Sequence, residues 1–101
     1  MHDLAALLLD ARMDMTLAAI DEIARADDLA AHEKSLRLSQ LSACARGLPC
    51  PELAFDPTAL RLRAIADALR DRPVERDAWR ARVLRALERG AAGTRRHASA
   101  A

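Results

Sequence analysis

Few side chains in this sequence have the types and spacing that catalysis or metal binding requires. His32 and Ser35 are three residues apart, so on a helix they are neighbours, as a base and a nucleophile would be. Neither an orienting acid nor an oxyanion loop is evident, so we interpret the pair as an ordinary polar histidine and a small residue at a helix contact. Cys44 and Cys50 do not combine with His32 at zinc-ligand spacing. We therefore predict no enzyme activity and no catalytic, cofactor-binding or metal-binding residues.

Arginine side chains give the second chemical signal. Segment 74–89 and the chain end carry arginines that a helix would present to phosphates, namely Arg82, Arg85, Arg89, Arg95 and Arg96. Against this interpretation, the net charge of the whole chain is only +1, and segment 74–89 contains no Asn or Gln to read base edges. No aromatic platform for stacking bases is visible either. Nucleic-acid binding through these arginines is therefore our alternative hypothesis.

Two other arginines fall inside an apolar stripe. Arg76 and Arg80 lie on the helical face formed by Trp79, Val83 and Leu87. An unpaired buried charge costs several kcal/mol, so each guanidinium must reach solvent or find a carboxylate. We predict that at least one pairs with Asp14 or Asp21 of the first helix. The alternative is that this stripe is a binding surface for another chain.

Charge is distributed unevenly along the chain. Residues 1–28 have a net charge of −5, and residues 29–101 have a net charge of +6. An acidic first helix and an arginine-rich last helix can neutralise each other or face different partners.

The composition predicts an all-α fold. The chain has 101 residues, which is enough for one domain, and contains 24 Ala and 16 Leu but only two Val and three Ile. Periodicity places helices at about 4–26, 29–46, 57–71 and 74–89, which predicts a compact four-helix bundle. This single domain spans residues 1–90, and the basic, Ala-rich tail 91–101 is expected to be flexible and disordered.

Local signals mark the ends of these helices. Asp3 and Asp27–Asp28 are expected to cap the first and second helices. Gly47 is expected to end the second helix in a left-handed conformation, and Asp56-Pro57 to start the third. The connector between them is expected to cover one end of the core with Leu48, Leu53 and Phe55.

Apolar periodicity assigns the buried faces. The first helix has an inward stripe of Leu9, Met13, Leu17, Ile20 and Ala24, and Met15 is expected to fill the core or to form an adaptable contact surface. The second helix is apolar on two sides, which is typical of a central helix or a subunit interface.

These patterns leave apolar surface that a monomer would expose. We expect it to bind another protein or a second copy in a homodimer, through Leu4, Leu7, Leu8, Leu29, Leu36 and Ala43. The predicted function is that of a small adaptor, regulator or chaperone of bacterial or phage type. We expect it in the cytoplasm and not in a membrane, because the sequence has no signal-peptide pattern, no bilayer-spanning apolar run and no disulfide framework.

Overall fold

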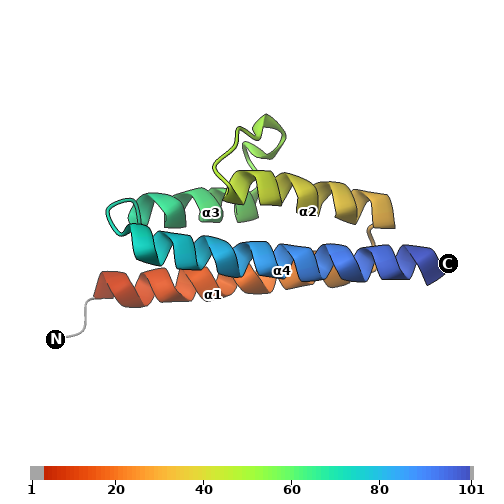
Figure 1. Ribbon diagram of the computed structural model, residues 1–101, viewed down its shortest axis with the longest axis horizontal. Helices are drawn as coiled ribbons and strands as arrows, with labels where there is room; N and C mark the ends of the chain where they lie inside the picture. The colour runs from red at the N-terminus through yellow and green to blue at the C-terminus, as the bar shows by residue number, and fades with distance from the viewer. Residues whose placement is uncertain (1–3, 101) are drawn as a thin grey trace.

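The computed structural model describes the backbone of residues 4–100 and the side chains of residues 4–93. Four α-helices and one short 3₁₀ helix follow in the order α1 (Leu4–Arg25), α2 (Ala31–Ala45), η1 (Pro51–Leu53), α3 (Pro57–Ala68) and α4 (Pro73–Ala100), with no strand in this range. The prediction of an all-α four-helix bundle is confirmed. α1 and α4 run side by side, and α2 and α3 lie nearly in line over them, so that each covers about half of the pair (Figure 1).

Every helix contributes to one core. Its most deeply buried apolar side chains are Ile20, Leu38, Leu41, Ile65, Leu69, Val83 and Leu87. The predicted inward stripe of α1 is confirmed, with Ile20 buried and Leu9, Met13 and Leu17 packed at the edge of the core. Thr16, which the periodicity did not assign to the core, is fully buried. Its hydroxyl donates to the Arg12 carbonyl oxygen at 2.7 Å, one turn back, which satisfies the polar atom.

α2 ends as the sequence predicts. Gly47 has φ +82°, and its N–H donates to the Cys44 carbonyl at 3.0 Å while the Leu48 N–H donates to the Ala43 carbonyl at 3.0 Å. These two hydrogen bonds form a Schellman motif, which needs the left-handed conformation that glycine adopts without steric cost.

The connector after Gly47 covers less of the core than expected. Only Leu53 of its three apolar side chains is buried, whereas Leu48 is exposed and Phe55 is 92% exposed. The prediction for Leu48 and Phe55 is therefore wrong. The physical reason is that the chain turns away from the bundle around η1 before it returns to α3, so that only Leu53 faces inward (Figure 1).

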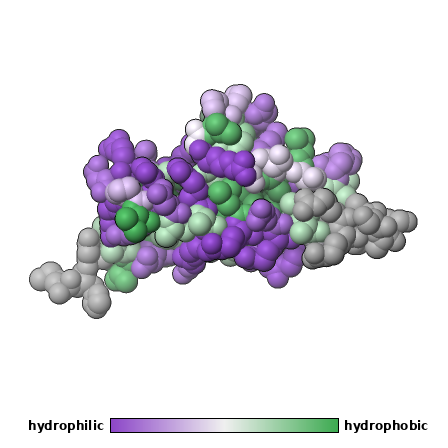
Figure 2. All heavy atoms as spheres, viewed as in Figure 1, coloured by the Kyte–Doolittle hydropathy of each residue, from purple (hydrophilic) through white to green (hydrophobic). Residues whose placement is uncertain are grey.

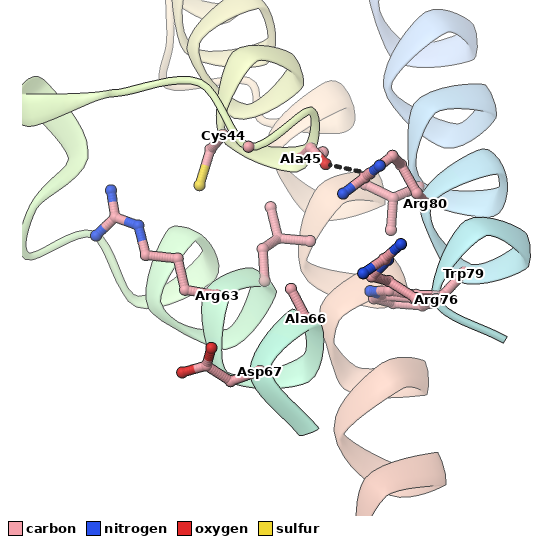
Figure 3. Close-up of a pocket in the computed structure, with 11 residues that line it drawn as sticks. Cys44, Ala45, Arg63, Ala66, Asp67, Arg76, Trp79 and Arg80 are labelled. Carbon is pink, nitrogen blue, oxygen red and sulfur yellow. Dashed lines mark hydrogen bonds between the residues drawn. The ribbon is translucent and has the colours of Figure 1, made fainter. Parts of the chain in front are cut away.

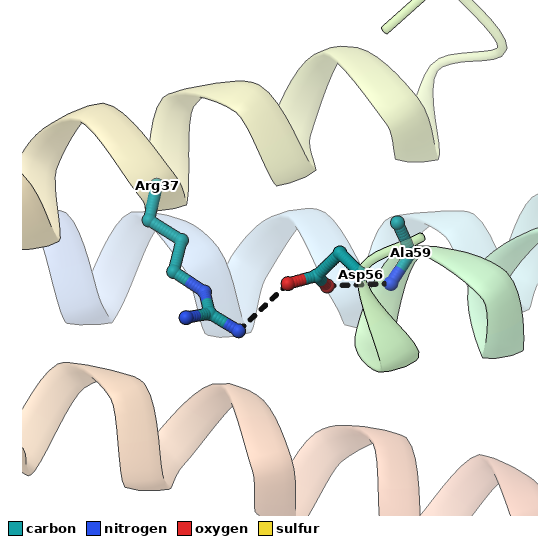
Figure 4. A network of polar contacts seen from close by, with 3 residues as sticks. All are labelled: Arg37, Asp56 and Ala59. Carbon is teal, nitrogen blue, oxygen red and sulfur yellow. Dashed lines mark hydrogen bonds and ion pairs between the residues drawn. The ribbon is translucent and has the colours of Figure 1, made fainter. Parts of the chain in front are cut away.

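α3 begins at the predicted cap. Asp56 accepts a hydrogen bond from the Ala59 N–H at 3.0 Å through Oδ2, and Pro57 takes the first helical position. The other carboxylate oxygen, Oδ1, accepts from Nη2 of Arg37 on α2 at 2.7 Å (Figure 4). One mostly buried carboxylate therefore caps α3 and ties it to α2.

Replacing Asp56 with alanine is expected to lower the free energy of unfolding by about 1–2 kcal/mol, because both the cap and the half-exposed ion pair are lost. Asp56→Asn keeps a side-chain oxygen for the Ala59 N–H and is expected to cost less. Urea denaturation of the two variants and of Arg37→Gln separates the contribution of the helix cap from that of the ion pair. If Asp56→Asn and Asp56→Ala lowered the free energy of unfolding equally, the capping role of Asp56 would be contradicted.

The predicted caps of α2 are wrong. α2 begins at Ala31, two residues later than expected, and its N-cap residue Ala30 makes no side-chain capping hydrogen bond. Asp27 and Asp28 instead lie exposed in the bend between α1 and α2, because the chain needs these residues to reverse direction. The predicted cap Asp3 lies outside the described residues. α1 and α3 end slightly earlier than predicted, at Arg25 and Ala68.

α4 continues past its predicted end at Arg89, because Gly90 does not stop the helix. Gly90 is buried, and a Cβ atom there would lie 3.0 Å from the Ala24 Cβ of α1 and 3.4 Å from Leu38 Cδ1 of α2. The glycine lets three helices approach closely. Ala91 packs at the edge of the core beyond it. For residues 94–101 the side chains lie outside the described part of the chain, and the expected flexibility of the tail stays a prediction there.

Candidate functional site

α1 has a second apolar face on the side away from the core. The exposed residues on this face recur at alternating spacings of four and three, namely Leu4, Leu8, Ala11, Met15 and Ala18. We call these five residues the outer seam. Leu4 is 69% exposed, Leu8 54% and Met15 53%. A mean spacing of 3.5 residues is the one that lets a helix pack along the whole length of another helix.

The outer seam has an acidic edge. Asp10, Asp14 and Asp21 lie exposed along one side of it, next to Leu7, whereas the other side carries Arg12. Figure 2 shows hydrophobic surface at the N-terminal end of α1, beside the grey residues 1–3. An apolar seam with a charged edge can contribute both affinity and selectivity to helix binding.

The structure groups only some of the predicted anchors. Leu4, Leu7 and Leu8 lie together in the first turns of α1. Leu36 is exposed but lies on α2, away from that end of α1 (Figure 1). Leu29 lies in the bend before α2 rather than on the helix, where it is half-buried, and Ala43 is half-buried on α2.

Ala11 and Ala18 are the members of the outer seam that the sequence interpretation missed, whereas Met15 is predicted to fill the core or to form a contact surface. The signal was present as the heptad spacing from Leu4 to Ala18. Periodicity identified the buried stripe of α1 correctly, but the exposed apolar residues on the opposite face were not recognised as a second stripe. Met15 is exposed, so it is not core filler.

The alternative arginine face lies on α4. Arg82, Arg85 and Arg89 are exposed, and within the described part of the chain their guanidinium groups make no hydrogen bond or ion pair. The side chains of Arg95 and Arg96 lie outside the described residues.

Arg76 and Arg80 do not pair with α1. Arg80 Nε donates to the carbonyl oxygen of Ala45, the last residue of α2, at 3.0 Å. Arg76 Nε lies 3.7 Å from Asp77 Oδ1, and this buried nitrogen has no hydrogen-bond partner. The predicted pairing with Asp14 or Asp21 is wrong, because the two arginines face the end of α2 while both aspartates are exposed on α1. Arg80 instead satisfies a carbonyl group at a helix C-terminus, where positive charge is favourable.

A cavity of about 320 Å³ lies beside these arginines, between the end of α2, α3 and α4 (Figure 3). Its apolar lining includes Leu62, Ala66, Trp79 and Val83. Its charged lining consists of Arg63, Arg76, Arg80 and Asp67. The cavity therefore combines an apolar wall with an excess of positive charge.

The cysteines act as structural donors. Cys44 and Cys50 are both free and buried, and their thiols donate to the carbonyl oxygens of Ala59 at 3.9 Å and Gln40 at 3.4 Å. Burial raises the pKa of the Cys44 thiol, and the nearby Arg63 guanidinium opposes that effect only in part. A thiol with a raised pKa is a weak nucleophile at neutral pH.

Other chemical groups are sparse in the part of the chain that the structure describes. His32 and Ser35 are both exposed on α2, and no group of three or more His, Cys, Asp or Glu side chains among the described residues could hold a metal ion. None of the described helices is long and apolar enough to cross a bilayer.

Comparisons of the chain with protein-family models, curated proteins and solved structures give no match.

Proposed function

We propose that this protein is a non-enzymatic interaction module that binds an amphipathic helix of another protein along the outer seam of α1. The observation that carries the proposal is the exposure of Leu4, Leu8 and Met15 at heptad spacing, directly opposite the buried stripe of the same helix. Fully burying a side chain of this size contributes about 1.5–3 kcal/mol, so a helix on this seam gains enough to offset its own ordering.

The charge beside the seam supports a partner of defined chemistry. Asp10, Asp14 and Asp21 would face the flank of a bound helix, so a partner with Lys or Arg beside its apolar seam is favoured. A second copy of the chain would bring two acidic α1 helices together. We therefore infer that the partner is a different protein rather than a second copy. The two free, buried thiols suit a reducing compartment such as the cytoplasm.

A designed peptide tests this proposal. The probe is a three-heptad helix with leucine at both seam positions and lysine at the flanking positions, labelled for fluorescence anisotropy. We expect the protein to bind it, and to bind a matched peptide with flanking glutamates at least about tenfold more weakly. Leu8→Asp should abolish binding, because it places a charge in the centre of the interface.

The matched control is Leu60→Asp, which changes an exposed leucine on α3 and should leave binding unchanged. Circular dichroism of both variants checks that the bundle remains folded. Binding that survives Leu8→Asp would contradict the proposal. A dimer of the chain alone that Leu8→Asp dissociates would mean that the seam binds a second copy instead.

The alternative function is nucleic-acid binding through Arg82, Arg85 and Arg89, and their exposure without protein partners supports it. This alternative would be favoured if nucleic acid co-purifies with the protein and no longer does so in the double variant Arg82→Glu/Arg85→Glu. Its affinity would fall steeply with salt, because phosphate binding releases counterions. Apolar contact along the outer seam depends much less on ionic strength.

A further inference from the structure

We propose that the cavity between the end of α2, α3 and α4 binds a carboxylate carried on an apolar group. Arg76 and Arg80 would hold the carboxylate, and the wall around Trp79 would hold the apolar group. No residue of α1 lines this cavity, so the site is separate from the outer seam.

The apolar wall is rigid because it belongs to the core. Leu62, Trp79 and Val83 are all buried and line the cavity from α3 and α4. The volume of about 320 Å³ accommodates a phenyl ring or a short alkyl chain. Water along such a wall lacks polar partners, so an apolar group should replace it favourably.

The positive charge of the cavity is poorly compensated by the protein. Arg76 and Arg80 are one turn apart on α4, and both line the cavity from that helix (Figure 3). Two like charges at this spacing are unfavourable without an anion between them. Arg63 lies on the other side of the site, where its Nη2 donates to the Cys50 carbonyl oxygen at 3.4 Å (Figure 3). Asp67 is the single acidic residue of the lining, and Asp77 lies 3.7 Å from Arg76 Nε outside it.

Hydrogen-bonding capacity is also unused there. Arg80 donates to the Ala45 carbonyl oxygen through Nε alone. The buried Nε of Arg76 has no hydrogen-bond partner and lies 3.7 Å from Asp77 Oδ1. A planar carboxylate accepts paired hydrogen bonds from guanidinium groups. A neutral apolar molecule would add no charged partner for Arg76 and Arg80 beyond Asp77 and the Ala45 carbonyl oxygen. An inorganic anion would leave the apolar wall in contact with water. Only a molecule with both features matches the whole cavity.

Trp79 makes the site directly observable. It is the only tryptophan, and the chain contains no tyrosine, so the intrinsic fluorescence arises at the cavity wall. We would titrate the full chain with 3-phenylpropanoate and follow the Trp79 emission, with isothermal calorimetry as a second readout. The controls are 3-phenylpropanol, which lacks the charge, and sulfate, which lacks the apolar body. We expect saturable binding of the carboxylate and at least about tenfold weaker binding of both controls.

Two variants on one helix test the role of the arginines. Arg76→Gln should weaken 3-phenylpropanoate binding about 10- to 100-fold, the range for loss of a hydrogen bond to a charged group. Its thermal stability should change little, because the buried Nε of Arg76 has no hydrogen bond to lose and its 3.7 Å ion pair is with the exposed Asp77. Arg82→Gln removes an exposed arginine outside the cavity lining and should leave the affinity unchanged.

The source of the carboxylate is decided by a second pair of probes. The probes are N-acetylphenylalanine and its amide. If N-acetylphenylalanine binds more tightly than both the amide and 3-phenylpropanoate, the ligand is the C-terminus of a peptide. Tighter binding of 3-phenylpropanoate would identify a free carboxylic acid, and either result supports the site. Equal affinity for acid and alcohol, unchanged affinity in Arg76→Gln, or no response in either readout would overturn the proposal.

Discussion

Replacing Leu41 with alanine is expected to lower the free energy of unfolding by about 2–5 kcal/mol. Leu41 is fully buried on α2, in the core that all four helices share. Truncation removes its apolar contacts and leaves a void that rigid helices fill only in part. The total stability of a small domain is about 5–15 kcal/mol, so this single change removes a large share of it.

The matched control for this experiment is Leu36→Ala. Leu36 is on the same helix but 59% exposed, so its truncation should change the stability by no more than about 0.5 kcal/mol. Thermal denaturation followed by circular dichroism should show a fall in Tm of more than about 10 °C for Leu41→Ala alone. Similar falls in Tm for the two variants would contradict the orientation of α2, in which Leu41 is buried and Leu36 is exposed.

Replacing Gly90 with leucine is expected to destabilise the bundle by about 1–3 kcal/mol or more through overpacking. The first added atom would already lie 3.0 Å from the Ala24 Cβ and 3.4 Å from Leu38 Cδ1. α1, α2 and α4 would have to move apart to admit the remaining atoms. Urea denaturation measures the loss directly.

The control for Gly90→Leu is Glu88→Leu, because Glu88 is exposed on the same helix and leucine suits a helix interior. Gly90→Ala should have a smaller effect, since its gain in helix propensity of roughly 1 kcal/mol opposes the tight contact. Adding Ala24→Gly to the Gly90→Ala variant should relieve that contact, so the effect of Gly90→Ala on the free energy of unfolding should become more favourable. If α4 ended at Arg89, as the sequence predicts, leucine at position 90 would have little effect.

The sequence by itself determined the features that depend on neighbouring residues. Composition determined the helical class, and apolar periodicity identified the buried stripes of α1 and α4. The Schellman motif at Gly47 and the cap at Asp56 are set by hydrogen bonds that span only three to five residues, so short signals sufficed to predict them.

Only the tertiary structure decided which neighbour each face meets. The sequence predicts that the last helix ends at about residue 89, but Gly90 is a point of close packing within α4, because Ala24 and Leu38 approach it from other helices. The sequence predicts that Arg76 or Arg80 pairs with a carboxylate of α1, but Arg80 instead donates to the carbonyl oxygen of Ala45 at the end of α2. The outer seam and the arginine-lined cavity likewise arise from how helices are placed against one another. A helical repeat specifies which residues share a face but not what packs there, because that contact depends on residues far away in the sequence.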